Sequence, residues 1–174
     1  MPTEHNSEVM RELLTSCALE LFADYGVVLE PAKAPVSPSE MVAVVGFTSD
    51  EMRGTLAISA QLDFFSRTNV ISSEPTEEQI RDWAGELGNQ LMGRVKNRLL
   101  AYNLVLAMGT PMVIIGMSMH LGQRRTGIVN RLAWTSSQGD IEAWLEASHE
   151  AGLWLERSAA AEDAIQAEGD LLFF

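Results

Sequence analysis

One long helical pattern constrains this chain more than any other feature of its sequence. Across residues 74–102, apolar side chains recur at the three- and four-residue spacing of a helix with one buried side. Thr76 and Gln79 have the spacing of a capping box and mark its start. Acidic residues in the first turn and basic residues near the end complement the helix dipole. Such a helix needs other elements to cover its apolar side.

The two sides of this helix carry different kinds of residue. Its outer side bears Asp82, Glu86 and Asn89, at spacing i, i+4 and i+7, with Gly93 one turn further on. Polar residues opposite an apolar stripe are usual on a surface helix, so the column alone does not establish a site. Glycine costs about 1 kcal/mol relative to alanine inside a helix, so Gly93 favours a partner that approaches the backbone closely. The expected core side comprises Ile80, Trp83, Ala84, Leu87 and Leu91.

Shorter segments on both sides of this helix have helix or strand patterns. Residues 7–25 predict a helix that Ser7 caps and Gly26 ends with a left-handed residue. Residues 41–47 and 53–59 predict a β-hairpin. Further strands are expected at 27–29, 104–107, 113–119 and 128–134, with a short helix at 62–68.

The segment after Gly139 is compatible with two structures. Ile141, Ala143 and Leu145 alternate as in a strand. Asp140 followed by Ile141, Trp144 and Leu145 equally fits the start of a helix. The sequence leaves both open.

The order of these elements predicts the fold class. A helix, a hairpin, a long helix and then several strands indicate an α+β domain with an antiparallel β-sheet, in which the long amphipathic helix carries the candidate site. We expect this domain to span residues 1–157. Residues 158–174 are expected to form a separate acidic, alanine-rich tail.

Charge and cysteine content exclude several classes of function. The net charge of −12 disfavours nucleic acid and membrane surfaces as partners, although a phosphorylated protein can still bind locally. Residues 1–6 are polar and lack a signal-peptide core, and no apolar run is long enough to cross a membrane, so we expect a cytoplasmic protein. Cys17 is the single cysteine, and we expect a buried, inert thiol.

Residues 82–96 resemble the signature of the CheC/CheX/FliY family of chemotaxis phosphatases. That signature has an Asp or Ser, then Glu-x-x-Asn, a small residue and a basic residue along one helix, and a proline after it. Residues 54–58 and 111–116 are similar to strands of the same family, and the likeness extends over roughly residues 10–145. The residues that match the signature are Asp82, Glu86, Asn89, Gly93, Lys96 and Pro111.

The resemblance implies an activity and a partner. Members of this family remove phosphate from the aspartyl phosphate of a CheY-like response-regulator receiver domain. CheC proteins usually have two Glu-x-x-Asn helices, whereas this chain has one, which is similar to CheX. CheX-type proteins are typically dimers, so a homodimer is expected.

The resemblance also implies a role for each site residue. Asn89 would orient the attacking water, because a carboxamide has both a donor and an acceptor, and Glu86 would reach the active-site lysine of the receiver. Asp82, Gly93 and Lys96 would contact the partner. The chain would need no metal or cofactor of its own, because Mg²⁺ would belong to the receiver. No covalent intermediate is expected.

Two other functions remain open. A CheX-like domain could dock a receiver, or another signalling partner, without catalysis. A structural domain of the flagellar switch type is the weaker alternative. His5, His120 and His149 show no metal-ligand spacing, and the sequence contains no phosphate-binding glycine motif and no nucleophile elbow.

Overall fold

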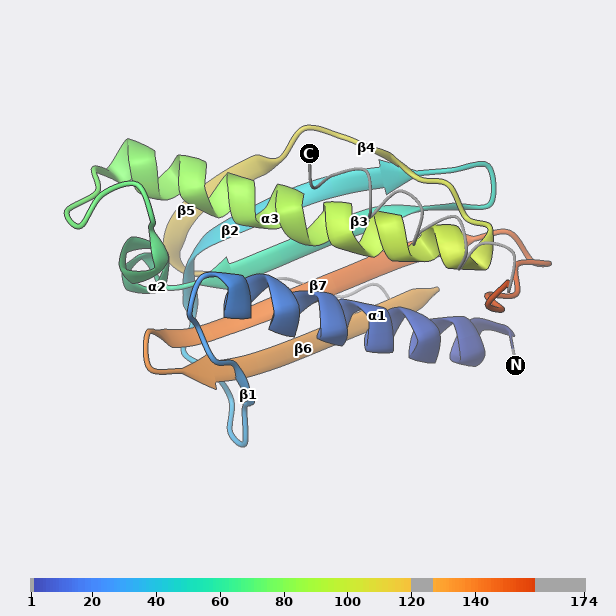
Figure 1. The fold of residues 1–174 in the computed structure, drawn as a ribbon. Helices are drawn as coiled ribbons and strands as arrows, with labels where there is room; N and C mark the ends of the chain where they lie inside the picture. Colours follow the sequence, from blue (N-terminus) through green and yellow to red (C-terminus); the bar gives the residue numbers. More distant parts are fainter. Residues whose placement is uncertain (1, 120–126, 159–174) are drawn as a thin grey trace.

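Two long helices lie side by side on one face of an antiparallel β-sheet (Figure 1). The structure is a computed structural model, and it describes residues 2–119 and 127–158. The long helices are α1 (Pro2–Asp24) and α3 (Glu77–Leu99), and the short helix α2 (Leu62–Thr68) precedes α3. The apolar core fills the space between these helices and the sheet.

The sheet has seven strands within the described residues, and all of its pairings are antiparallel. The strand order is β1-β6-β7-β3-β2-β4, and β5 also pairs with β2. This arrangement confirms the expected α+β fold class and the hairpin of β2 and β3. The strands are β1 (Glu30–Pro31), β2 (Ser39–Thr48), β3 (Met52–Ala60), β4 (Ala107–Met108), β5 (Met112–Met119), β6 (Ile128–Ser136) and β7 (Gly139–His149).

Helix α3 begins as the sequence predicts. The backbone N–H of Gln79 donates to Thr76 Oγ1 at 3.3 Å, and the backbone N–H of Thr76 donates to Gln79 Oε1 at 2.9 Å. This reciprocal pair is the expected capping box. The α-helix ends at Leu99 and is followed by a 3₁₀ turn, η1 (Leu100–Tyr102), so the expected helical segment ends in a tighter turn.

The apolar side of α3 packs on the sheet. Trp83, Ala84, Leu87 and Leu91 are buried, and Ile80 is half-buried against the core. Two of the helix glycines allow this close packing. A Cβ atom at Gly88 would lie 3.3 Å from the Cβ of Ala43 on β2, and one at Gly85 would lie 3.3 Å from a methyl group of Val113 on β5.

Helix α1 begins earlier than predicted. It starts at Pro2, so Ser7 lies inside the helix and is not its cap, contrary to our expectation. Long-range contacts explain the extra turns. Asn6 is fully buried, its Nδ2 donates to the carbonyl of Leu153 at 2.9 Å, and its Oδ1 accepts from the N–H of Leu155 at 2.9 Å. These partners come from the segment after β7 and hold the start of α1 in place.

Two expected strands are displaced towards the C-terminus. Gly26 has φ +72° and follows α1 as predicted, but residues 27–29 form no strand, and only Glu30–Pro31 pairs with β6. Residues 104–107 were expected as a strand, whereas Ala107–Met108 is the segment that pairs with β2. Both segments are continuously apolar because several of their side chains are buried in the core, before the backbone reaches a strand edge.

The ambiguous segment after Gly139 is the strand β7. It pairs with β3 on one side and with β6 on the other. Ile141, Ala143 and Leu145 belong to the main core, whereas Trp144 packs with Val42 in a small cluster of its own. Residues 159–174 lie outside the described residues, so the boundary expected at residue 157 stays a prediction.

Candidate active site on helix α3

The candidate site is the outer side of α3, which faces away from the sheet. Asp82 and Glu86 are exposed, and Asn89 and Gly93 are half-buried, while the apolar residues of the same helix are buried. The side chain of Asp82 is 71% exposed and lies 3.9 Å from Arg81. The structure therefore brings the carboxylates and the carboxamide to one accessible face. Their chemical roles stay predictions.

The Asn89 carboxamide is free to bind a small ligand. Among residues 2–119 and 127–158, no side-chain hydrogen bond involves Asn89. Its carbonyl oxygen can accept a hydrogen bond while its amide group donates one. A water molecule needs this combination of partners if it is to be held in a fixed orientation.

The Glu86 carboxylate, in contrast, has a defined partner. Gln90 Nε2 donates to Glu86 Oε1 at 2.7 Å. The hydroxyl of Tyr25, just after α1, donates to Gln90 Oε1 at 2.8 Å. Sequence reasoning missed both residues. The i, i+4 spacing of Glu86 and Gln90 was a usable signal, whereas Tyr25 is separated from Gln90 by 65 positions and had none.

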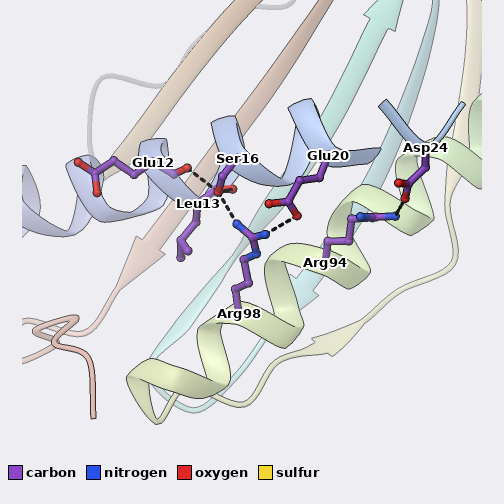
Figure 2. Close-up of polar contacts among 7 residues, drawn as sticks. All are labelled: Glu12, Leu13, Ser16, Glu20, Asp24, Arg94 and Arg98. Carbon is purple, nitrogen blue, oxygen red and sulfur yellow. Dashed lines mark hydrogen bonds and ion pairs between the residues drawn. The ribbon is translucent and has the colours of Figure 1, made fainter. Parts of the chain in front are cut away.

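Ion pairs continue this contact between α1 and α3 (Figure 2). Arg94 donates to Asp24 at 2.5 Å. Arg98 pairs with Glu20 and also donates to Ser16 Oγ at 2.5 Å. Gln90, Arg94 and Arg98 recur at four-residue spacing on α3, and their partners run backwards along α1. We call Gln90, Arg94 and Arg98 the inter-helix row, because each of them contacts α1 or the residue that follows it.

The proline of the signature lies against the other flank of α3. The Cβ and Cγ atoms of Pro111 would be 4.0 Å from a Cβ atom at Gly85, the residue before Glu86. Pro111 immediately precedes β5, and α3 lies between this strand and α1 (Figure 1). The structure thus brings Pro111 to the helix that carries the other signature residues.

The remaining signature residues extend the same face. A Cβ atom at Gly93 would meet nothing within 4 Å in the described part of the chain, so no contact there explains a glycine. Lys96 lies one turn nearer the end of α3 and is half-buried. This leaves an open surface beside the Glu86 and Asn89 side chains.

Other kinds of site lie elsewhere or are not found. A surface hollow of about 740 Å³ is lined by residues of β2, β3, β4 and β7 and includes neither Glu86 nor Asn89. Among the described residues, no group of three or more His, Cys, Asp or Glu side chains is arranged to hold a metal ion. No helix in the described part of the chain is long and apolar enough to cross a membrane.

Three solved structures with a similar fold are described as CheX, a CheC-like protein and a complex of CheX with CheY. CheX from Vibrio vulnificus matches with a TM-score of 0.72, 18% identity, and coverage of 80% of this chain and 96% of that chain. A CheC-like superfamily protein from Shewanella sp. PV-4 matches with a TM-score of 0.71, 19% identity, and coverage of 80% and 97%. A chain of the CheX–CheY–BeF₃–Mg²⁺ complex from Borrelia burgdorferi matches with a TM-score of 0.63, 18% identity, and coverage of 79% and 97%. The fold is that of a CheC/CheX-like domain.

The family itself is identified by sequence. The model of the family described as chemotaxis phosphatase CheX matches residues 41–129, which is just over half of the chain. The chain belongs to the CheX family. The matched segment contains the whole of α3 and Pro111. Comparison with curated proteins found no match.

Proposed function

We propose that this chain hydrolyses the aspartyl phosphate of a CheY-like receiver domain. The observation that carries the proposal is the position of the exposed Glu86 and the half-buried Asn89 on one accessible face of α3, in a member of the chemotaxis phosphatase CheX family. The Borrelia burgdorferi neighbour is a CheX in complex with CheY, which supports a receiver as the class of partner.

The proposed reaction places a water molecule in line with the phosphorus atom. The water oxygen bonds to phosphorus as the bond between phosphorus and the aspartyl oxygen breaks. The products are the receiver's free aspartate and inorganic phosphate, and the water proton passes to solvent. The Asn89 carboxamide orients the water, a task that an amide side chain also performs in some GTPases. Mg²⁺ on the receiver stabilises the phosphoryl charge.

The other residues act in docking. The Glu86 carboxylate forms an ion pair with the active-site lysine of the receiver and so aligns the two proteins. Asp82, one turn before Glu86, supports this contact, and Gly93 lets the receiver approach the helix closely. Lys96 lies at the far end of the same face and tunes the binding. A receiver partner also implies that the protein works in the cytoplasm.

Two substitutions separate catalysis from docking. Asn89→Ala should lower the single-turnover rate on the order of a hundredfold, because misplacing the reacting water raises the barrier of the chemical step. Its affinity for a receiver treated with beryllofluoride, a stable phosphoryl analogue, should be unchanged. Glu86→Ala should lower both affinity and rate. The measurements are phosphate loss from a phosphorylated receiver at saturating phosphatase, and titration of the analogue-bound receiver.

Asn97→Ala is a matched control for these variants. It removes an exposed carboxamide from the same helix, two turns beyond Asn89, and should leave both measurements unchanged. Wild-type turnover by Asn89→Ala would disprove the proposed mechanism. If the wild-type protein binds the analogue-bound receiver but never accelerates phosphate loss from any receiver, it is a docking module and not a phosphatase.

The proposal includes a homodimer that forms through β5. This strand pairs with β2, and no other described strand pairs with its second edge. Its apolar residues are unusually open to solvent: Met112 is 62% exposed, Ile114 44%, Ile115 41% and Met117 91%. An unpaired strand edge with exposed apolar side chains is suited to pairing with a second chain.

A further inference from the structure

We infer that Gln90 and Tyr25 are positioning residues that hold the Glu86 carboxylate ready for the receiver lysine. The inference rests on the function proposed above. It starts from two hydrogen bonds, from Tyr25 to Gln90 and from Gln90 to Glu86. We call these three hydrogen-bonded side chains the relay.

The direction of these hydrogen bonds is set by chemistry. An ionised carboxylate can only accept, so Gln90 must turn its amide N–H group towards Glu86. The Gln90 carbonyl then faces Tyr25, whose hydroxyl donates to it at 2.8 Å. The contact of 2.7 Å to Glu86 uses Oε1 and leaves Oε2 for a partner. The relay therefore fixes one oxygen of Glu86 and leaves the other available.

The first member of the relay is anchored in the core. The Tyr25 ring packs edge to face on Trp83, with ring centroids 4.9 Å apart. Trp83 is only 4% exposed, and its indole N–H donates to the buried Thr68 hydroxyl at 3.2 Å. The position of the Tyr25 hydroxyl is thus set by packing of its ring against a buried side chain.

The alignment of the two long helices holds the relay together. The ion pairs of Arg94 with Asp24 and of Arg98 with Glu20 join the same two helices (Figure 2). Gln90 precedes Arg94 by four residues, so its side chain lies on the same side of α3. The ion pairs thus connect α1 and α3 at two further points. The position of Tyr25 opposite Gln90 is therefore set by the whole helix pair.

The neutral charge of Gln90 is the decisive feature. The next two residues of the inter-helix row, Arg94 and Arg98, are each paired with an acidic residue of α1. An arginine at position 90 would neutralise Glu86 and compete with the receiver lysine. A glutamine orients the carboxylate through a hydrogen bond but leaves its full charge for the partner. An ordered carboxylate also loses less side-chain entropy when the receiver docks.

The test compares two variants with a control. Gln90→Met keeps the length of the side chain but removes both hydrogen bonds, and Tyr25→Phe removes only the hydroxyl. Both should weaken binding of a purified CheY-like receiver treated with beryllofluoride, Gln90→Met by roughly three- to tenfold. Glu8→Gln breaks an exposed ion pair with Arg11 inside α1 that takes no part in this arrangement, and it should leave this affinity unchanged. Thermal unfolding shows whether each variant is folded, and Tyr25→Phe keeps the ring contact with Trp83.

A double-mutant cycle separates positioning from a general structural role. In a Glu86→Ala background, Gln90→Met and Tyr25→Phe should have no further effect on affinity, because the carboxylate they position is gone. Equal losses in both backgrounds would overturn the inference, as would wild-type affinity of both single variants. If Glu86→Ala itself binds and turns over normally, the proposed function of Glu86 fails instead. The two failures are therefore distinguishable.

Discussion

At the scale of single residues, Glu86 and Asn89 occupy the same face of α3 but have different surroundings. Glu86 is held by Gln90, whereas Asn89 makes no side-chain hydrogen bond with any described residue. The difference fits the two proposed roles. A carboxylate that aligns two proteins gains from being held in advance, and a carboxamide that orients water needs its donor and acceptor unoccupied.

The buried thiol of Cys17 gives a prediction about reactivity and pH. Burial raises the pKa of Cys17 from 9.0 to about 11, because the thiolate is poorly solvated in the core. The native protein should not react with a thiol reagent at pH 8, and the unfolded protein should react fully. Stability from this residue is complete below the unfolded pKa of 9.0 and is lost as the pH rises through about 11.

The pH effect can be isolated by substitution. Denaturant unfolding between pH 8 and pH 11 should show a loss of stability in the wild type that is smaller in Cys17→Ala, which has no thiol to ionise. Rapid labelling of the native protein at pH 8 would contradict the buried position of Cys17, which has 0% exposure.

At the scale of elements, the glycines of α3 serve two purposes. Gly85 and Gly88 allow the helix to lie close to β5 and β2, and a methyl group at either position would make a tight contact. Gly93 faces open space, so a side chain at this position would clash with no described residue. The same helix thus has one glycine requirement for folding and a separate one that we attribute to docking.

Substituting these glycines tests the distinction. Gly93→Ala should raise the free energy of unfolding by up to about 1 kcal/mol, because alanine has the higher helix propensity and no neighbour is in the way. The same variant should bind the receiver more weakly. Gly88→Ala should gain much less stability, because its new methyl group lies 3.3 Å from Ala43.

Denaturant unfolding and receiver titration measure the two effects. Unchanged receiver affinity in Gly93→Ala would show that the docking surface does not reach this turn of α3.

At the scale of the whole molecule, the two proposed interfaces lie on different elements. The receiver would bind the outer side of α3, and the second copy of the chain would bind the edge of β5. The apolar side chains of α3 pack on the sheet, so its polar residues lie on the opposite side of the helix. Strand β5 lies at one edge of the sheet (Figure 1), and several of its apolar residues are exposed. A dimer that extends the sheet through β5 can leave the outer side of α3 open in each copy. This requirement follows from the proposed function, because each Glu86 and Asn89 must reach a receiver.

Charge on the β5 edge should dissociate the dimer. Met117→Glu places a carboxylate on the most exposed apolar residue of β5, at 91% exposure, and should shift the protein from dimer to monomer. Val28→Glu is the control, because Val28 is 73% exposed but lies outside the sheet. Light scattering at micromolar concentration measures the mass of each. A wild-type protein that is monomeric in this range would refute the proposed dimer.

Interactions between near neighbours in the sequence determine the helix that carries the candidate site. The capping box of Thr76 and Gln79, the apolar stripe and the column of Asp82, Glu86 and Asn89 are all set by the geometry of one helix. The same holds for the hairpin of β2 and β3, whose strands are adjacent in sequence. Interactions between near neighbours can be read from spacing alone, because the helix or turn fixes the distances.

Other features depend on residues that are distant in sequence and that meet only in the folded chain. β7 is a strand because β3 and β6 supply hydrogen-bond partners on both sides, which local periodicity cannot show. The start of α1 depends on Asn6 reaching residues after β7. The relay from Tyr25 to Glu86 exists only because α1 and α3 are packed and aligned. Such contacts require chain segments to meet in space, and no spacing within either segment determines that meeting.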